Sequence, residues 1–213
     1  MHQIKIGMED KFKDILAKAI ALFMQFGVKS QTMDDVASKL GMSKKTLYQY
    51  VSNKEDLVLK AIRFFVENQK KQFEEILQTE GNAIEHFIAI NKVISAQLKQ
   101  MHPSIMFDVQ KYYPEAWNVV RDFKIEFISQ LIKDNITQGV KESLYRPNLN
   151  KEIVAFMYVT MADNLFSMNP LSMKYSIFDL HRELVRYHIR AIASEKGLHY
   201  LQQKININNE EEF

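Results

Sequence analysis

The segment "VASKLGMSKKTLYQYVSNKEDL", residues 36–57, places one helix end and two helix starts close together. Gly41 predicts the end of a short helix, because glycine adopts the left-handed conformation that such ends often need. Ser43 is a favourable N-cap for a second short helix, expected over residues 44–51. Residues 52–55, "SNKE", predict a capping box that opens a long helix. Two short helices joined by a tight turn are a candidate helix-turn-helix.

The rest of the chain also shows helical periodicity. Apolar residues recur at helical spacing, and no sustained two-residue alternation is present, so the sequence predicts an all-α protein. Thr32, followed at the third position by Asp35, is expected to cap the second helix. The expected helices cover about residues 9–26, 33–40, 44–51, 54–77, 82–100, 104–111, 114–141, 150–168 and 175–195, with a turn at Asn169-Pro170 and a fraying polar end at residues 206–213.

The composition limits the classes of function. The 213 residues are 46% apolar, which is enough for a well-buried core. The absence of cysteine excludes a disulfide framework, a thiol nucleophile and a thiolate metal site. The N-terminal residues lack the apolar core of a signal peptide, and no apolar run reaches the roughly 18 residues of a membrane helix. We therefore expect a soluble, cytoplasmic protein with no membrane partner.

Charge is unevenly distributed along the chain. The net charge is +2, but residues 1–54 contain nine lysines and five acidic residues, so this segment carries +4 and the remainder −2. An excess of positive charge at one end favours a polyanionic partner such as nucleic acid.

The expected helix 44–51 has two different faces. Projection at about 100° per residue places Leu47 and Val51 together, packed on the preceding helix. The opposite face and its flanks carry Lys45, Thr46, Gln49, Tyr48 and Tyr50. These side chains can read guanine edges, thymine methyl groups and adenine edges, and the tyrosines can bond phosphates. Lys44, nearer the packed side, is assigned to the DNA backbone, as is Lys54 at the start of the next helix.

The alternative for the lysine pair is an ordinary solvated helix face, which is commoner in helical proteins. The surrounding pattern favours DNA, because the order and spacing of four segments resemble the TetR family of bacterial transcriptional regulators. These segments are "TMDDVA" at 32–37, "LGMS" at 40–43, "TLYQY" at 46–50 and "NKEDL" at 53–57. The resemblance covers about fifty N-terminal residues.

The resemblance implies a three-helix DNA-binding domain over residues 1–55, a helical ligand-binding and dimerisation domain over residues 56–200, and a polar tail over residues 201–213. It implies a homodimer that binds a double-stranded DNA operator, often with an inducer pocket, and we expect a repressor that is released by a small-molecule effector. By position, the family's DNA contacts fall on Thr32, Lys44, Lys45, Thr46, Tyr48, Tyr50 and Lys54. Lys45 departs from the family pattern, which often has glycine there, and Val51 stands where phenylalanine is more usual.

The last two long helices, expected over residues 150–168 and 175–195, carry apolar residues on more than one face. We expect them to pair with their two-fold mates in a four-helix dimer interface, as the family's architecture implies. The alternative is that the rest of the same chain covers the second face.

An effector pocket is expected to be apolar and adaptable, with a few polar groups, and therefore to take a hydrophobic or amphipathic ligand. The alternative for each of these residues is ordinary core. The candidate ligand-binding residues are Phe65, Met106, Phe107, Tyr112, Tyr113, Trp117, Phe123 and Met161.

Catalytic and metal-binding patterns are weak. His181 and His188 are seven residues apart and could share a helix face, but no third ligand stands at a supporting spacing, so we expect surface histidines and no metal or cofactor. The sequence has no glycine-rich phosphate loop and no nucleophile elbow. We expect a regulator and not an enzyme. The rival classes are a helical interaction protein with a non-functional helix-turn-helix, and an all-α enzyme with a buried site.

Overall fold

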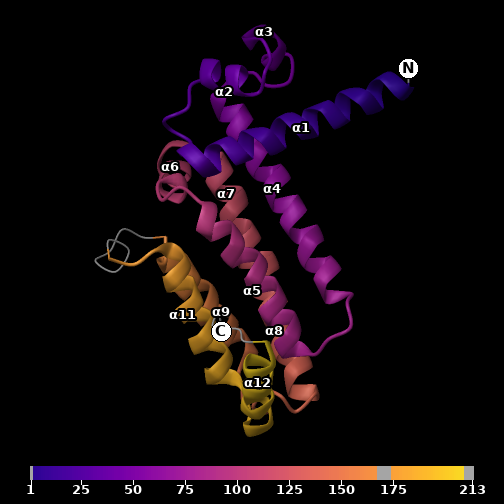
Figure 1. The fold of residues 1–213 in the computed structure, drawn as a ribbon, viewed down its shortest axis with the longest axis vertical. Helices are drawn as coiled ribbons and strands as arrows, with labels where there is room; N and C mark the ends of the chain where they lie inside the picture. The colour runs from indigo at the N-terminus through magenta and orange to yellow at the C-terminus, as the bar shows by residue number, and fades with distance from the viewer. Residues whose placement is uncertain (1, 167–173, 209–213) are drawn as a thin grey trace. The chain divides into compact units, whose positions relative to one another are not determined.

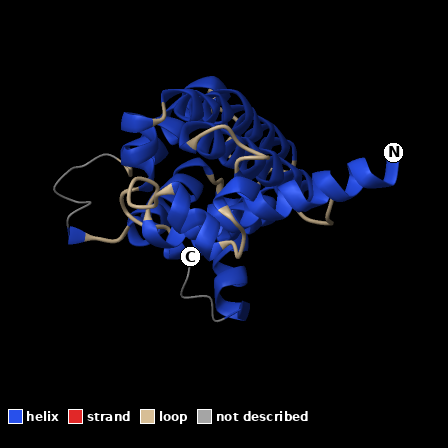
Figure 2. Cartoon of the chain, turned by 90° about the horizontal axis from the view of Figure 1, so that it is seen from above, coloured by secondary structure: helices blue, strands red, loops and turns tan. Residues whose placement is uncertain are grey.

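The computed structural model describes residues 2–166 and 174–208, with side chains described for residues 9–166 and 174–204. Within these ranges the regular elements are helices joined by loops, as Figure 2 shows, and no strand is present. The predicted all-α fold is therefore confirmed. The expected turn at Asn169-Pro170 and the last five residues of the polar end lie outside the described residues.

Figure 1 shows the order of the helices along the chain. They are α1 His2–Phe26, α2 Met33–Lys39, α3 Lys44–Leu47, α4 Lys54–Leu77, α5 Ala83–Gln100, α6 Ile105–Tyr112, α7 Pro114–Asp122, the π-helical η1 Phe123–Ile128, α8 Ser129–Lys141, α9 Lys151–Asn164, α11 Ile177–Ile192 and α12 Glu195–Asn208. Among the described residues no helix is both long enough and apolar enough to cross a bilayer.

Several helical predictions need correction. The first helix begins at His2 instead of near residue 9, and α9 and α11 end at Asn164 and Ile192 instead of near residues 168 and 195. The helix expected over residues 114–141 is interrupted by η1, in which the backbone winds as a π-helix. No helix was expected beyond residue 195, whereas α12 covers Glu195–Asn208. Leu201 is buried in the second hydrophobic core, which explains why a largely polar segment folds back as a helix.

α4 begins with a cap shifted by one residue from the prediction. The side-chain oxygen of Asn53 accepts a hydrogen bond from the backbone N–H of Asp56 at 2.8 Å. The Asp56 carboxylate accepts from the backbone N–H of Ser52 at 2.8 Å and from its hydroxyl at 3.1 Å. Asn53 is therefore the N-cap in place of Ser52, and Asp56 has the role predicted for Glu55.

The chain forms two compact units. The N-terminal unit contains Met1–Lys71 and Gln100–Asp122, and the C-terminal unit contains Gln72–Lys99 and Phe123–Phe213. Each unit has its own core of buried apolar side chains. The functional domain limits, with a boundary after residue 55, remain a prediction.

Candidate nucleic-acid interface

The α2-turn-α3 segment of the N-terminal unit is fixed by local hydrogen bonds. Thr32 and Asp35 form the predicted capping box, in which Asp35 N–H donates to the Thr32 hydroxyl at 3.2 Å and Thr32 N–H to the Asp35 carboxylate at 2.9 Å. Gly41 has φ +68, in the left-handed region predicted for it. The Ser43 hydroxyl accepts from Thr46 N–H at 3.0 Å and caps α3. The sequence thus defines both helix starts and the turn between them.

The second helix of the candidate helix-turn-helix, α3, is shorter than expected. α3 ends at Leu47 instead of Val51, because the next residues form tighter turns, with Gln49 N–H donating to Thr46 O at 3.1 Å and Tyr50 N–H to Leu47 O at 3.0 Å. The packed face is nevertheless the predicted one, since Leu47 is 0% and Val51 2% exposed. These two side chains hold the whole turn against the core of the N-terminal unit.

The outer surface of this turn carries Lys45, Tyr48 and Gln49, all of which are exposed. Thr46 is half-buried, and its hydroxyl lies 2.8 Å from that of Ser43. A cation, a phenol and an amide therefore face solvent together. This combination suits the mixed donors and acceptors of a major groove.

Lys44 lies beside this outer surface and has a partner within the chain. Its ammonium lies 2.9 Å from the Asp34 carboxylate, and both side chains are exposed. The hydrogen bond to Asp34 raises the pKa of Lys44. A DNA phosphate approaching Lys44 would compete with this carboxylate.

Lys54 and Tyr50 are less accessible than the outer residues. The Lys54 ammonium donates to Lys29 O at 3.2 Å, and burial lowers its pKa. The ring of Tyr50 stacks on Phe12, with centroids 5.7 Å apart. Thr32 is exposed, with its side chain held in the α2 cap. Tyr50 and Lys54 are therefore less exposed than Lys45, whereas Thr32 is exposed as Lys45 is.

Contacts between α6 and the loop before α2 could not be seen in the sequence. The Lys29 ammonium donates to the Tyr112 hydroxyl at 2.9 Å, and the Lys29 backbone N–H donates to Asp108 at 3.3 Å. Asp108 is buried and also accepts from the Ser104 hydroxyl at 2.8 Å. These partners are 79 and 83 residues from Lys29, so no short-range pattern indicates them.

The eight candidate ligand-binding residues are divided between the two units. Tyr113 is buried in the core of the N-terminal unit, and Met106 and Trp117 pack against that core. Phe107 and Tyr112 are exposed and Phe65 is half-buried. In the C-terminal unit Phe123 is half-buried and Met161 exposed. Their role in ligand binding remains a prediction.

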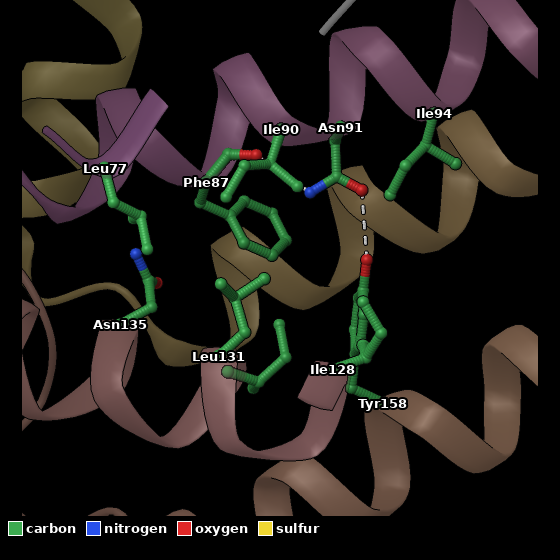
Figure 3. A pocket seen from close by; sticks show the side chains of 10 residues that line it. Leu77, Phe87, Ile90, Asn91, Ile94, Ile128, Leu131, Asn135 and Tyr158 are labelled. Atoms are coloured by element: carbon green, nitrogen blue, oxygen red, sulfur yellow. Dashed lines mark hydrogen bonds between the residues drawn. The ribbon is translucent and has the colours of Figure 1, made fainter. Parts of the chain in front are cut away.

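The C-terminal unit contains a small cavity lined by none of these eight residues (Figure 3). Its volume is about 20 Å³, enough for about one water molecule. The lining is mainly apolar, and its polar groups already have partners. Tyr158 OH donates to Asn91 at 3.0 Å, and Asn135 donates to Ala83 O at 2.7 Å. The side chains of Asn91, Asn135 and Tyr158 therefore already have hydrogen-bond partners within the chain.

The two histidines of α11 are not on the surface, which corrects the prediction. His181 is 4% and His188 6% exposed, and burial lowers the pKa of each to about 4. The ring of His188 packs on Phe87 and Tyr158, with centroids 5.2 and 4.5 Å away. In the described part of the chain no group of three histidine or carboxylate side chains is placed to hold a metal ion.

A capped helix-turn-helix with an exposed, partly basic outer surface defines a DNA-binding protein. Residues 15–61 match the family model described as bacterial regulatory proteins, tetR family. The HTH-type transcriptional regulator YvaF of Bacillus subtilis is 24% identical over 186 residues, covering 86% of this chain and 96% of YvaF. The HTH-type transcriptional repressor KstR2 of Mycobacterium tuberculosis is 22% identical over 161 residues, covering 72% of this chain and 78% of KstR2.

A solved structure shows the same fold. It is that of a transcriptional regulator from Saccharomonospora viridis in complex with choline, with a TM-score of 0.68 and 20% identity, covering 88% of this chain and 100% of that one. Residues 15–61 therefore carry the TetR-family DNA-binding segment, and most of the chain is similar to transcriptional regulators.

Proposed function

We propose that this TetR-family regulator is a sequence-specific repressor whose homodimer leaves its operator when a small hydrophobic or amphipathic effector binds. The observation that carries the DNA-binding part is the outward orientation of Lys45, Tyr48 and Gln49 on a turn anchored by Leu47 and Val51. The similarity to the repressor KstR2 supports repression.

The residues around the turn have two kinds of proposed role. Lys45 and Gln49 read base edges, with Thr46 contributing contact to a thymine methyl group. The remaining contacts are to the phosphate backbone and position the turn in the groove. The residues assigned to the backbone are Thr32, Lys44, Tyr48, Tyr50 and Lys54.

The proposed dimer interface involves α9 and α11, with unequal contributions. α9 exposes a row of large apolar side chains: Ile153, Phe156, Met157 and Met161, of which Phe156 is 69% exposed. The apolar residues of α11, including Leu184 and Ile189, are buried within the C-terminal unit. Tyr187 is the large hydrophobic side chain that α11 leaves exposed among its described residues. α9 therefore supplies most of the apolar surface that a second copy would bury.

The effector response is supported less directly. The Saccharomonospora viridis structure, which has the same fold, is a complex with choline, and this supports the proposal of a small-molecule effector. The cavity of about 20 Å³ is too small for such a ligand, so binding there requires the surrounding helices to move apart. Regulation follows only if the effector binds the DNA-free arrangement of the dimer more tightly than the DNA-bound one.

The experiment that tests the proposal is selection of bound fragments from random double-stranded DNA with the purified protein. We expect enrichment of a two-fold-symmetric sequence whose half-sites are about one helical turn apart. Affinity for that sequence should fall steeply as salt rises. A protein with Lys45→Ala and Gln49→Ala, both exposed, is the matched control and should lose the enrichment while remaining folded.

Two results would contradict the proposal. Absence of enrichment over background would favour the alternative, a helical interaction protein with a non-functional helix-turn-helix. A monomer in sedimentation at micromolar concentration would exclude the dimer. If the protein is a monomer, Phe156→Ser in the proposed interface should leave its sedimentation unchanged.

A further inference from the structure

The loop between α1 and α2 contains an exposed lysine, Lys29, whose ammonium has a neutral partner. The ammonium donates to the Tyr112 hydroxyl at 2.9 Å and lies 4.3 Å from the centroid of the same ring. Among the residues with described side chains, no carboxylate lies within ion-pair distance of it. An ammonium has three donors, so a single hydrogen bond to a phenol leaves two donors and the charge for another partner.

Lys29 adjoins two residues that are assigned to the DNA backbone. Thr32, the N-cap of α2, follows three positions later in the chain. The Lys54 ammonium donates to the Lys29 carbonyl at 3.2 Å, so the backbone of Lys29 lies against a proposed phosphate contact. Double-stranded DNA carries about one negative charge per 1.7 Å of its axis, so two neighbouring lysines can each find a phosphate. Lys29 therefore places a second cation at the edge of the proposed DNA-binding surface.

α6 holds the backbone of Lys29 as well as its side chain. Asp108, which precedes Tyr112 by four residues on α6, accepts a hydrogen bond from the Lys29 backbone N–H at 3.3 Å. Asp108 is buried, and its carboxylate also accepts from the Ser104 hydroxyl at 2.8 Å. Residues 104, 108 and 112 are spaced four apart, so a single face of α6 and its preceding residue holds the loop.

The segment before α6 is held against the end of α1. The His102 backbone N–H donates to Met24 O at 2.7 Å. Gly27 has φ +80, and a Cβ at this position would lie only 2.8 Å from the Ser104 hydroxyl oxygen, so the close approach depends on glycine. These contacts explain why residues 100–122 belong to the same compact unit as the helix-turn-helix, although they are far from it in the chain.

We propose that Lys29 is a further contact to the DNA backbone, next to that of Lys54. Tyr112 and Asp108 of α6 are the residues that position it. The proposal rests on the proposed function, because it extends the same DNA-binding surface. Tyr112 restricts the long lysine side chain before DNA arrives, and a side chain that is already ordered loses less conformational entropy on binding. A phosphate contact carries no base preference, so Lys29 should strengthen binding to all sequences alike.

The test compares the salt dependence of DNA binding in the parent protein and in Lys29→Gln. Each phosphate contact that is lost lowers the slope of the logarithm of affinity against the logarithm of salt concentration by about 0.9. Lys29→Gln should therefore reduce the slope by about one and weaken binding to the selected operator and to an unrelated duplex by the same factor. Lys29→Arg keeps the charge and should keep the parental slope. Fluorescence anisotropy on both duplexes measures these values.

Tyr112→Phe separates positioning from contact. It removes the hydroxyl that accepts from Lys29 and keeps the ring, so the charge remains but is less ordered. We expect about threefold weaker binding with the parental slope. Lys196→Gln is the matched control, because the exposed Lys196 of the C-terminal unit also donates to a neutral oxygen, Glu142 O, at 3.0 Å. It should change neither quantity, and chemical denaturation of every variant should match the parent closely, since the substituted side chains are exposed.

The proposal is overturned if Lys29→Gln keeps the parental slope on both duplexes, because Lys29 then contacts no phosphate. The positioning role is overturned if Tyr112→Phe binds DNA as tightly as the parent or more tightly, since the hydroxyl would then be neutral or compete with the phosphate. A reduced slope on the unrelated duplex, with no operator enriched by selection, would refute the sequence-specific function and leave the contact intact. An enriched operator with an unchanged slope would do the reverse. Absence of binding to any duplex would overturn both.

Discussion

The turn between α2 and α3 and the core of the C-terminal unit use polar groups in opposite ways. In the turn, the caps of Thr32 and Ser43 join residues three apart, and Lys45 and Gln49 remain in solvent. In the C-terminal core, Tyr158 bonds Asn91 from 67 residues away, and both are buried. Polar groups on the proposed DNA-binding surface are thus available to a partner, whereas those of the core are used to join helices.

The largest effect is expected from a substitution that removes the buried support of α3 and the turns that follow it. Leu47→Ala should lower the free energy of unfolding by about 2–5 kcal/mol, because a fully buried side chain is lost and a cavity remains. DNA binding should fall with it. Chemical denaturation measures the change, and Tyr48→Ala, its exposed neighbour, should alter stability by less than about 0.5 kcal/mol. Equal effects of the two substitutions would refute the assigned packing.

The C-terminal core should be the more pH-sensitive region. His181 and His188 have folded-state pKa values lowered to about 4 by burial, below the ordinary value of 6.5. The unfolded chain therefore binds more protons between these values, and stability falls as pH drops from 6.5 towards 4. Each histidine should contribute about 3 kcal/mol over this window.

His188→Phe isolates this effect, because carboxylates titrate alike in both proteins. Denaturation at several pH values should show a shallower loss of stability in the variant. His199→Asn changes an exposed histidine and should behave like the parent protein. An unchanged pH dependence in His188→Phe would place the protonation elsewhere.

On the proposed DNA-binding surface, substitutions of Lys45 and Lys54 should have different kinds of effect on DNA binding. The Lys45 side chain faces outward. Lys45→Ala should therefore lower the discrimination between bases at one position by about 1–3 kcal/mol. The Lys54 ammonium contacts Lys29 O. Lys54→Ala should therefore weaken binding to all DNA sequences about equally. Binding to the selected operator and its single-base variants distinguishes them. The opposite pattern would exchange the two roles.

The smallest expected effect concerns the Lys44–Asp34 pair. Asp34→Asn removes a carboxylate that would compete with a phosphate for Lys44, so DNA should bind about threefold more tightly at low salt. Fluorescence anisotropy at two salt concentrations measures this, and the gain should diminish at high salt. Weaker binding would show that Asp34 positions Lys44 for DNA.

Sequence reasoning succeeded where a structure depends on near neighbours. The caps of Thr32 and Ser43 and the left-handed Gly41 follow from residue types within a few positions. It was less accurate at the start of α4, where two neighbouring residues are both suitable N-caps. Asn53 is the N-cap there, in place of the predicted Ser52. It also missed α12, because burial of Leu201 and the Lys204–Glu85 ion pair, which hold this polar segment, depend on residues far away in the chain.

The sequence by itself determined the all-α fold, the helix-turn-helix and the inward face of Leu47 and Val51, because these depend on spacing and short-range hydrogen bonds. Only the tertiary structure decided which faces of α9 and α11 are covered, that His181 is buried, and that Lys29 meets Tyr112 of α6. Such properties arise when helices far apart in the chain pack together. The environment of a side chain then depends on residues that no local pattern specifies.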